Sequence, residues 1–301
     1  MPFPASPRDL TTPWLSEALS ASVEAFELAP LAAQGATSET VRIRLHYAPG
    51  ADGPASLIAK FPGPTPAMRE VGRESGAYRI ETWFYRYLAT TQESLPVPSC
   101  YFASFDRPTG NFLLLLEDLT GWEPGDLFTS DLPRIRRMLT ALAAIHAANW
   151  ERAAANERWL SRFTGPALGS IGRLLTQAIP TCRARWPEFT GPLETVSAAI
   201  AANPAIYGRL GALPRTLVHG DFHLQNALFS PDGDDCRIID WATCFAGPAV
   251  ADISRLLTTC LAPDLRRTHE PGLLAHYHRA LVGNGVTSYS LAQLRDHYPL
   301  G

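Results

Sequence analysis

The stretch LVHGDFHLQNALF, residues 217–229, followed by CRIIDW, residues 236–241, carries the densest polar signal of the sequence. Two short apolar runs in it predict strands, and the SPDGDD between them contains an Asp-Gly pair, which strongly favours a turn. Folding this hairpin brings Asn226, which enters the first strand, beside Asp240, which leaves the second. The sequence therefore predicts an amide oxygen and a carboxylate close together at one end of a hairpin.

Hard oxygen ligands of this kind suit Mg²⁺, which commonly takes one or two protein groups together with phosphate oxygens and water. Asp221 lies just upstream in the loop, and its carboxylate can point at the same place without binding the metal. There it would accept a proton from an attacking hydroxyl, or orient that hydroxyl. The two segments thus predict a metal-assisted site with one further carboxylate.

Lys60 is the only lysine in the chain, because all other members of its 26 lysine and arginine residues are arginine. It lies in SLIAKFPG, residues 56–63, a short apolar run typical of a strand. Arginine cannot replace lysine where a compact charge with three donors must fit a tight space. We interpret Lys60 as a functional cation, and the alternative is chance survival under an arginine-rich codon usage.

The first third of the chain has the pattern of an antiparallel sheet. In TVRIRLHY, residues 40–47, apolar and polar residues alternate with the period of a half-buried strand. A small-residue turn at residues 35–38 precedes it, and in the next strand Lys60 faces away from Leu57, Ala59 and Phe61. The further expected strands are EAFELAPLAAQG, CYFASF and NFLLLLE.

The pattern then becomes helical. Residues 66–89 predict helix, with Ile80, Phe84, Tyr87 and Leu88 on one apolar face. From residue 132 to residue 150 and beyond, the chain is mostly Ala- and Leu-rich helix. We therefore expect two lobes with a cleft between them. Their expected bounds are residues 1–117 for the nucleotide-binding lobe, 118–121 for the hinge and 122–301 for the helical catalytic and substrate lobe.

Length and composition exclude several classes of protein. A chain of 301 residues with 46% apolar and 18% charged residues describes a globular protein. The formal charge of −3 argues against nucleic acid as a partner, and no apolar run is long enough to span a bilayer. Five cysteines without a C-x-x-C pair, and a start without a signal-peptide pattern, predict reduced thiols and a cytoplasmic location.

The spacing H-G-D-x-x-x-x-N at residues 219–226, with I-D-W at residues 239–241, resembles the catalytic core of the aminoglycoside phosphotransferase and choline-kinase-like family. Protein kinases have the same spacing in H-R-D-x-x-x-x-N. SLIAKFP resembles the strand with the phosphate-binding lysine, ETWFYRYLA the helix with its glutamate partner, and LLLLEDLTG the hinge that holds adenine. FAGPAVADISRLL and YHRALVGNGV most resemble the ecdysteroid-kinase-like and bacterial uncharacterised phosphotransferases.

This resemblance implies an α+β, two-lobed protein-kinase-like fold, with a small antiparallel-sheet N-terminal lobe and a larger, mostly helical C-terminal lobe. It also implies an ATP- and Mg²⁺-dependent kinase that acts on a hydroxyl of a small molecule. The roles it implies are catalytic base for Asp221, metal ligand for Asn226 and Asp240, nucleotide contact for Lys60, Glu81, Ser38, Glu117 and Leu119, and support of the catalytic loop for His219 and Asp252. Glu74 is the alternative to Glu81 as partner of Lys60.

Two segments depart from the family pattern. GATSE, residues 35–39, is not the glycine-rich loop of kinases, so no motif supports Ser38 as a phosphate contact. The chain ends in HYPLG, inside an expected helix begun near Ser290, whereas relatives usually run further; part of the helical lobe is expected beyond residue 301. Asp252 is expected in the first turn of a helix begun by Pro248.

Two other functions stay open. One is a non-catalytic nucleotide-binding protein of the same fold. The other is a non-haem iron oxygenase with His219, Asp221 and His269 as ligands, which requires a β-barrel although residues around His269 have a helical pattern. The acceptor is open among antibiotic, sterol, choline-like amine and sugar, as is ATP versus GTP. The histidines expected on the surface or in packing are His223, His269, His276 and His278.

Overall fold

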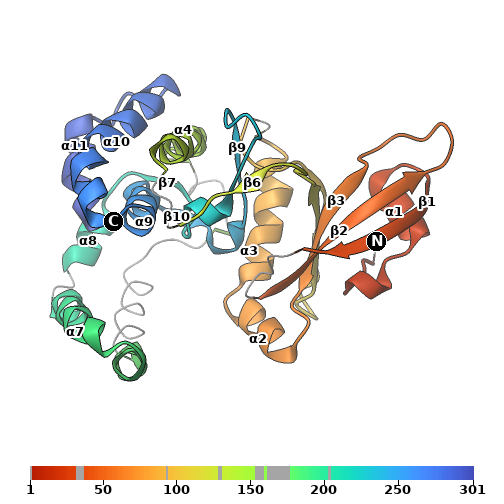
Figure 1. The fold of residues 1–301 in the computed structure, drawn as a ribbon, viewed down its shortest axis with the longest axis horizontal. Helices are drawn as coiled ribbons and strands as arrows, with labels where there is room; N and C mark the ends of the chain where they lie inside the picture. The colour runs from red at the N-terminus through yellow and green to blue at the C-terminus, as the bar shows by residue number, and fades with distance from the viewer. Residues whose placement is uncertain are drawn as a thin grey trace.

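The computed structural model describes residues 2–31, 37–92, 94–127, 131–152, 159–160, 177–202 and 205–301. In Figure 1 the N-terminal sheet lies at one end of the molecule and the C-terminal helices lie at the other. The expected α+β class, with a sheet-rich first part and a mostly helical second part, is therefore confirmed.

The N-terminal part is a five-stranded antiparallel sheet of order β1-β2-β3-β5-β4. Its strands are β1 (Val23–Pro30), β2 (Ser38–Tyr47), β3 (Ser56–Pro62), β4 (Cys100–Phe105) and β5 (Phe112–Glu117). On β3, Leu57, Ala59 and Phe61 are fully buried and join a hydrophobic cluster with α1 (Thr12–Leu19). Because neighbouring residues of a strand face opposite ways, Lys60 points to the other side of the sheet.

The helical segment after β3 is broken into three pieces: α2 (Pro66–Glu74), α3 (Ala77–Trp83) and a π-helix (Phe84–Ala89). Gly76, with φ of +74°, separates the first two. The expected apolar face is correct for Ile80, Phe84 and Leu88 but wrong for Tyr87, which is 44% exposed. The wider π-helical turn changes the 3.6-residue period, so Tyr85 is buried in its place.

The C-terminal part combines helices with two small sheets. Its helices include α4 (Leu132–Ala148), α7 (Pro187–Ala202), α8 (Ala205–Gly211), α9 (Val250–Cys260), α10 (Pro263–Gly283) and α11 (Leu291–His297). One small sheet pairs β10 (Phe245–Pro248) with β7 (Arg215–Val218), and the other has the order β6 (Glu123–Pro124), β8 (Ala227–Phe229), β9 (Cys236–Ile238). Short 3₁₀ turns include η1 (Pro7–Asp9), η3 (Leu224–Asn226), η4 (Trp241–Thr243) and η5 (Tyr298–Leu300).

The predicted hairpin is confirmed, because β8 and β9 pair antiparallel and Gly233 in their turn has a φ of +72°. The helix expected from Pro248 starts later. Pro248 is the last residue of β10, paired with Arg215, and α9 begins at Val250. The expected helix near Ser290 is α11, whose first turn Ser290 caps; it ends at His297, before η5.

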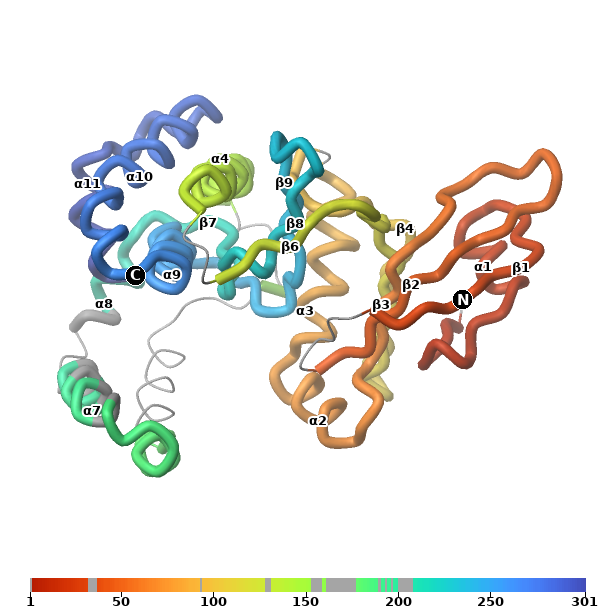
Figure 2. Tube along the Cα trace, viewed as in Figure 1, coloured from red at the N-terminus to blue at the C-terminus, as the bar shows by residue number. Residues whose placement is uncertain are grey.

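One hydrophobic cluster joins the two parts of the chain. It contains Leu114 and Leu116 of β5, α3 residues, and most buried side chains of the C-terminal part. At its centre the rings of Phe84 and Trp241 stack at 3.9 Å with an interplanar angle of 5°. Figure 2 shows α3 lying between the sheet and the β8–β9 hairpin. The segments of chain before and after the expected hinge, residues 118–121, therefore share one hydrophobic core.

We predict that Phe84→Ala lowers the free energy of unfolding by about 3–5 kcal/mol, because it removes a fully buried ring and leaves a cavity against Trp241. Tyr87→Ala, a change in the same π-helix at an exposed ring, should cost well under 1 kcal/mol. Urea unfolding of both variants measures the difference. Equal destabilisation by the two changes would contradict this description of the core.

Candidate active site

The loop after β7 is shaped by a buried carboxylate. Asp252, in the first turn of α9, accepts hydrogen bonds from the backbone N–H groups of His219 at 2.7 Å and Gly220 at 2.9 Å. Gly220 has a φ of +87°, and a Cβ there would lie 2.5 Å from the carbonyl oxygen of Thr243. Only glycine fits this backbone position without strain. The loop is thus held directly before Asp221.

A buried histidine contacts Asp252, and a buried tyrosine contacts that histidine in turn. His146 of α4 lies 3.4 Å from Asp252 through Nε2 and 2.7 Å from the Tyr277 hydroxyl through Nδ1. All three side chains are fully buried. Both ring nitrogens of His146 thus have a polar partner, which fixes the geometry of this network in the interior.

His219 lies in the loop as a bracing residue, and both of its ring nitrogens are engaged. Nε2 lies 2.9 Å from the carbonyl oxygen of Ile239, and Nδ1 accepts the backbone N–H of Asp221 at 3.2 Å. Among the residues that the structure describes, no group of three His, Cys, Asp or Glu side chains is arranged to hold a metal ion. The hypothesis of an iron site at His219, Asp221 and His269 is therefore wrong.

The Asp221 carboxylate is contacted on both oxygens. Oδ1 accepts from Arg255 Nη2 at 2.7 Å and Nε at 3.2 Å, and Oδ2 lies 3.3 Å from His223 Nε2. The hydrogen bond from His223, with those from Arg255, lowers the pKa of Asp221 far below its ordinary value, although partial burial acts against them. Asp221 is therefore an ionised hydrogen-bond acceptor at neutral pH.

Asn226 and Asp240 meet at the end of the β8–β9 hairpin, since the backbone N–H of Ile239 donates to the carbonyl of Asn226 at 3.0 Å. The Asn226 amide nitrogen donates to the Asp221 carbonyl at 2.9 Å, so its side-chain oxygen is the atom left to bind a cation. Asp240 has a φ of +64°, a backbone region costly for a residue with a Cβ. Such local strain is typical of functional positions, and here it directs a half-exposed carboxylate toward β3.

Lys60 connects the sheet to this hairpin. Its ammonium lies 2.7 Å from Glu81 Oε2 and 3.1 Å from Asp240 Oδ1. Burial alone would lower the pKa of Lys60, but the two carboxylates outweigh burial and raise it, so the ammonium stays charged. Glu74 is exposed at the end of α2, and Glu81 is the glutamate beside Lys60.

The expected hinge is fixed to the sheet by a residue that the sequence did not single out. Asp118 accepts from Arg42 Nε at 2.6 Å and from the Ser56 hydroxyl at 2.7 Å. Burial alone would raise the pKa of Asp118, but these hydrogen bonds lower it below its ordinary value. Some backbone groups beside Asp118 already have hydrogen-bond partners. The Glu117 N–H donates to the Ser99 carbonyl, and the Leu119 carbonyl accepts from the Trp122 N–H.

Ser38 lies on β2, the strand next to the one that carries Lys60. It is the first residue of β2, pairs with Pro62 and is 3% exposed. Residues 32–36, which include the start of the GATSE segment, lie outside the described residues. The phosphate role of Ser38, like the adenine roles of Glu117 and Leu119, stays a prediction.

Two residues at Asp221 were not predicted. His223 was expected to be a surface or packing histidine, but its ring lies against the Asp221 carboxylate. Arg255 lies in FAGPAVADISRLL, but the sequence analysis gave it no role. Only their spacing in the sequence could have indicated these two residues. His223 is two residues after Asp221 in the same loop, and Arg255 is three residues after Asp252, on the same face of a helix.

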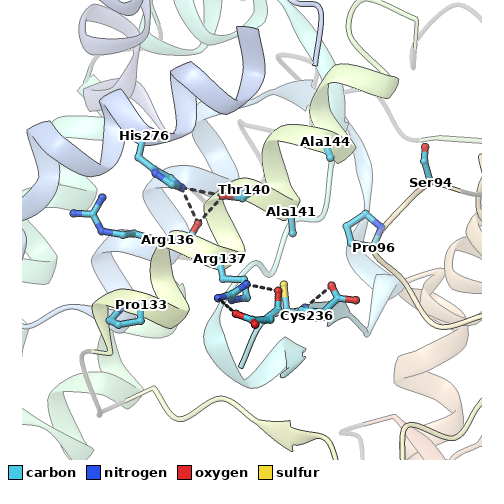
Figure 3. A pocket seen from close by; sticks show the side chains of 12 residues that line it. Ser94, Pro96, Pro133, Arg136, Arg137, Thr140, Ala141, Ala144, Cys236 and His276 are labelled. Atoms are coloured by element: carbon cyan, nitrogen blue, oxygen red, sulfur yellow. Dashed lines mark hydrogen bonds and ion pairs between the residues drawn. The ribbon is translucent and has the colours of Figure 1, made fainter. Parts of the chain in front are cut away.

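A separate pocket of about 520 Å³ opens between α4, α10 and the β8–β9 hairpin (Figure 3). Arg136, Thr140 and His276 line one side, where His276 Nε2 lies 2.9 Å from the Thr140 hydroxyl. Cys236 lines the other side, and burial raises the pKa of its thiol to about 12, so it is no nucleophile at neutral pH. None of the predicted site residues lines this pocket.

The five cysteines are all unpaired thiols, as expected. Within the described ranges, no helix has the length and apolar character needed to cross a bilayer.

Comparison with known proteins identifies the family. Residues 33–285 match the model of the ecdysteroid kinase-like family. We found no match among curated proteins.

Solved structures of similar fold include a choline kinase from Streptococcus pneumoniae, with 18% identity, a TM-score of 0.54, and coverage of 95% of this chain and 90% of that one. A choline kinase from Cryptosporidium parvum has 12% identity, a TM-score of 0.57, and coverage of 91% and 80%. An aminoglycoside phosphotransferase from Streptomyces rimosus, solved with ADP and streptomycin, has 18% identity, a TM-score of 0.52, and coverage of 91% of each chain.

At these identities the likeness shows a shared fold, which is that of the protein-kinase-like phosphotransferases. The family match covers most of the chain, including strands β2 to β5 of the sheet, the loop after β7 and the β8–β9 hairpin. The chain therefore belongs to the ecdysteroid kinase-like family.

Proposed function

We propose that this protein is an ATP- and Mg²⁺-dependent phosphotransferase that phosphorylates a hydroxyl of a small molecule. The observation that carries the proposal is the Lys60 ammonium, which lies between Glu81 and Asp240 beside the loop that presents Asp221. Catalysis of phosphoryl transfer depends mainly on positioning and on charge stabilisation. A fixed cation, two hard oxygen ligands and an ionised carboxylate on one hairpin and its loop supply both.

Each side chain has a separate task in this proposal. The acceptor oxygen forms a bond to the terminal phosphorus while the bond from that phosphorus to the bridging oxygen breaks, and ADP leaves with that oxygen. Asp221 accepts the hydrogen bond of the acceptor hydroxyl, and the proton passes to Asp221 or to solvent as the bond forms. Because the pKa of Asp221 lies far below its ordinary value, orienting the hydroxyl is its main contribution.

The residues at the hairpin end fit Mg²⁺. The Asn226 side-chain oxygen and the Asp240 carboxylate are the hard ligands that this ion takes alongside phosphate oxygens and water. Mg²⁺ bound there would neutralise charge on the phosphates. Lys60 adds a second positive charge, which Glu81 holds in place.

A coupled assay of ADP release tests the proposal over a panel of hydroxyl compounds that includes aminoglycosides, macrolides, steroids, sugars and amino alcohols. We expect acceptor-dependent release of ADP that requires Mg²⁺. The second candidate, a non-catalytic nucleotide-binding protein of the same fold, predicts nucleotide binding without ADP release, with or without acceptor. Release of ADP would therefore decide between the two.

Asp221→Asn should leave nucleotide affinity nearly unchanged and lower turnover by a factor on the order of 10²–10⁴, because the neutral amide orients the hydroxyl less well and cannot take its proton. Steady-state kinetics and calorimetry measure the two quantities. Asp264→Asn, at an exposed carboxylate of α10, is the control and should behave as wild type. Near-normal turnover of Asp221→Asn would remove Asp221 from this role.

Asp240→Ala should abolish transfer and weaken nucleotide binding in the presence of Mg²⁺, because it removes the charged ligand. Asn226→Ala should have the same effect more mildly, since it removes a neutral ligand. Asp235→Ala, on the same hairpin, is the control. Titration calorimetry with and without Mg²⁺ checks the assignment, and wild-type binding by both site variants would show it to be wrong.

A further inference from the structure

Arg255 holds one oxygen of the Asp221 carboxylate and leaves the other to different groups. Its Nη2 and Nε both donate to Oδ1, at 2.7 Å and 3.2 Å, whereas Oδ2 faces His223 Nε2 at 3.3 Å and the Asn226 amide at 3.5 Å. A guanidinium that served only as a counter-charge could bind both oxygens in parallel. Here the guanidinium is fixed along one edge, at Asp221 Oδ1 alone.

Among the described residues, the opposite edge of the guanidinium has no hydrogen-bond partner. Of its five N–H groups, two point at Asp221, and the described residues offer no partner to the two on Nη1 or to the second on Nη2. The side chain is 46% exposed. Two parallel N–H groups on a planar fork match the oxygens of a carboxylate or a phosphoryl group.

The surroundings argue against a purely structural ion pair. Asp221 is 37% exposed, and an ion pair between side chains this accessible contributes little to stability. The backbone of the loop is held separately, by Asp252. Arg255 therefore holds the Asp221 side chain, whereas Asp252 holds the backbone of the loop.

We propose that the free edge of Arg255 binds an oxyanion next to the hydroxyl that Asp221 orients. This inference rests on the proposed phosphotransferase function and adds a ligand class to that site. The oxyanion has two chemical sources: the terminal phosphoryl group of the nucleotide, or an acid group on the acceptor. In either case Arg255 touches a reacting partner, and a cationic group of the acceptor cannot occupy the same place.

The test compares Arg255→Gln and Arg255→Lys with wild type. Arg255→Gln removes the charge, and Arg255→Lys keeps the charge but loses the fork. Arg267→Gln, which breaks an exposed ion pair with Asp264 on α10, is the matched control. Melting temperatures of all variants should stay close to wild type. Calorimetry then measures affinity for Mg·ADP, for a non-hydrolysable Mg·ATP analogue, and for sulfate in the presence of that analogue.

If the nucleotide supplies the oxyanion, Arg255→Gln weakens binding of the ATP analogue by at least about tenfold and leaves ADP affinity unchanged. If the acceptor supplies it, nucleotide affinities stay equal, and sulfate binding to the analogue complex is lost. In either case, the affinity of Arg255→Lys should lie between those of wild type and Arg255→Gln. The proposal is overturned if Arg255→Gln binds ADP, the analogue and sulfate as wild type does.

Failure of the proposed function gives a different result. In that case wild type itself does not bind Mg·ADP or the analogue. Sulfate titrated into the unliganded proteins then still tests Arg255, because the free edge is formed without nucleotide. Equal sulfate affinity of wild type and Arg255→Gln in that titration would also overturn the proposal.

Discussion

The contact of the Lys60 ammonium with Glu81 and Asp240 is the interaction on which the rest of the site depends. It ties together β3, α3 and the end of the β8–β9 hairpin, three segments from distant parts of the chain. Glu81 is almost fully buried, so an uncompensated charge there would be costly. Removing one partner of a buried ion pair typically costs about 3–5 kcal/mol, because the other charge remains in a poorly solvated place.

This contact explains why a chain that otherwise uses arginine retains one lysine. The ammonium fits between two carboxylates on different elements, with three donors in one small volume. A planar guanidinium has the same charge but cannot direct its donors to both carboxylates from the same point. Asp240 contacts Lys60 from a left-handed backbone conformation, so the local strain and the ion pair occur at the same residue.

The sequence predicted the parts of the site that depend on local pattern. Alternation placed Lys60 on the face of β3 opposite Phe61, and turn chemistry paired the strands that carry Asn226 and Asp240. Choosing Glu81 over Glu74 needed the structure, because both lie on helical segments and only burial against Lys60 separates them. Tyr87 was misplaced because a 3.6-residue period does not hold through a π-helix.

Contacts that depend on how distant elements pack could not be predicted. Arg255 reaches Asp221 across 34 positions, and Asp252 reaches the loop across 33, so both depend on the packing of α9 against β7. The sequence indicated a supporting role for Asp252 only through family resemblance. It gave no reason to place a guanidinium on the Asp221 carboxylate, because the segment FAGPAVADISRLL, which contains Arg255, implied no role for this residue.

The affinity of Lys60→Arg for Mg·ATP, measured by titration calorimetry, tests whether the site needs the shape of lysine as well as its charge. We expect a protein with a melting temperature close to wild type that has lost most of its affinity for Mg·ATP, because charge without the fit between Glu81 and Asp240 is insufficient. Wild-type affinity in this variant would contradict that role of Lys60 and would mean that the single lysine is an accident of codon usage.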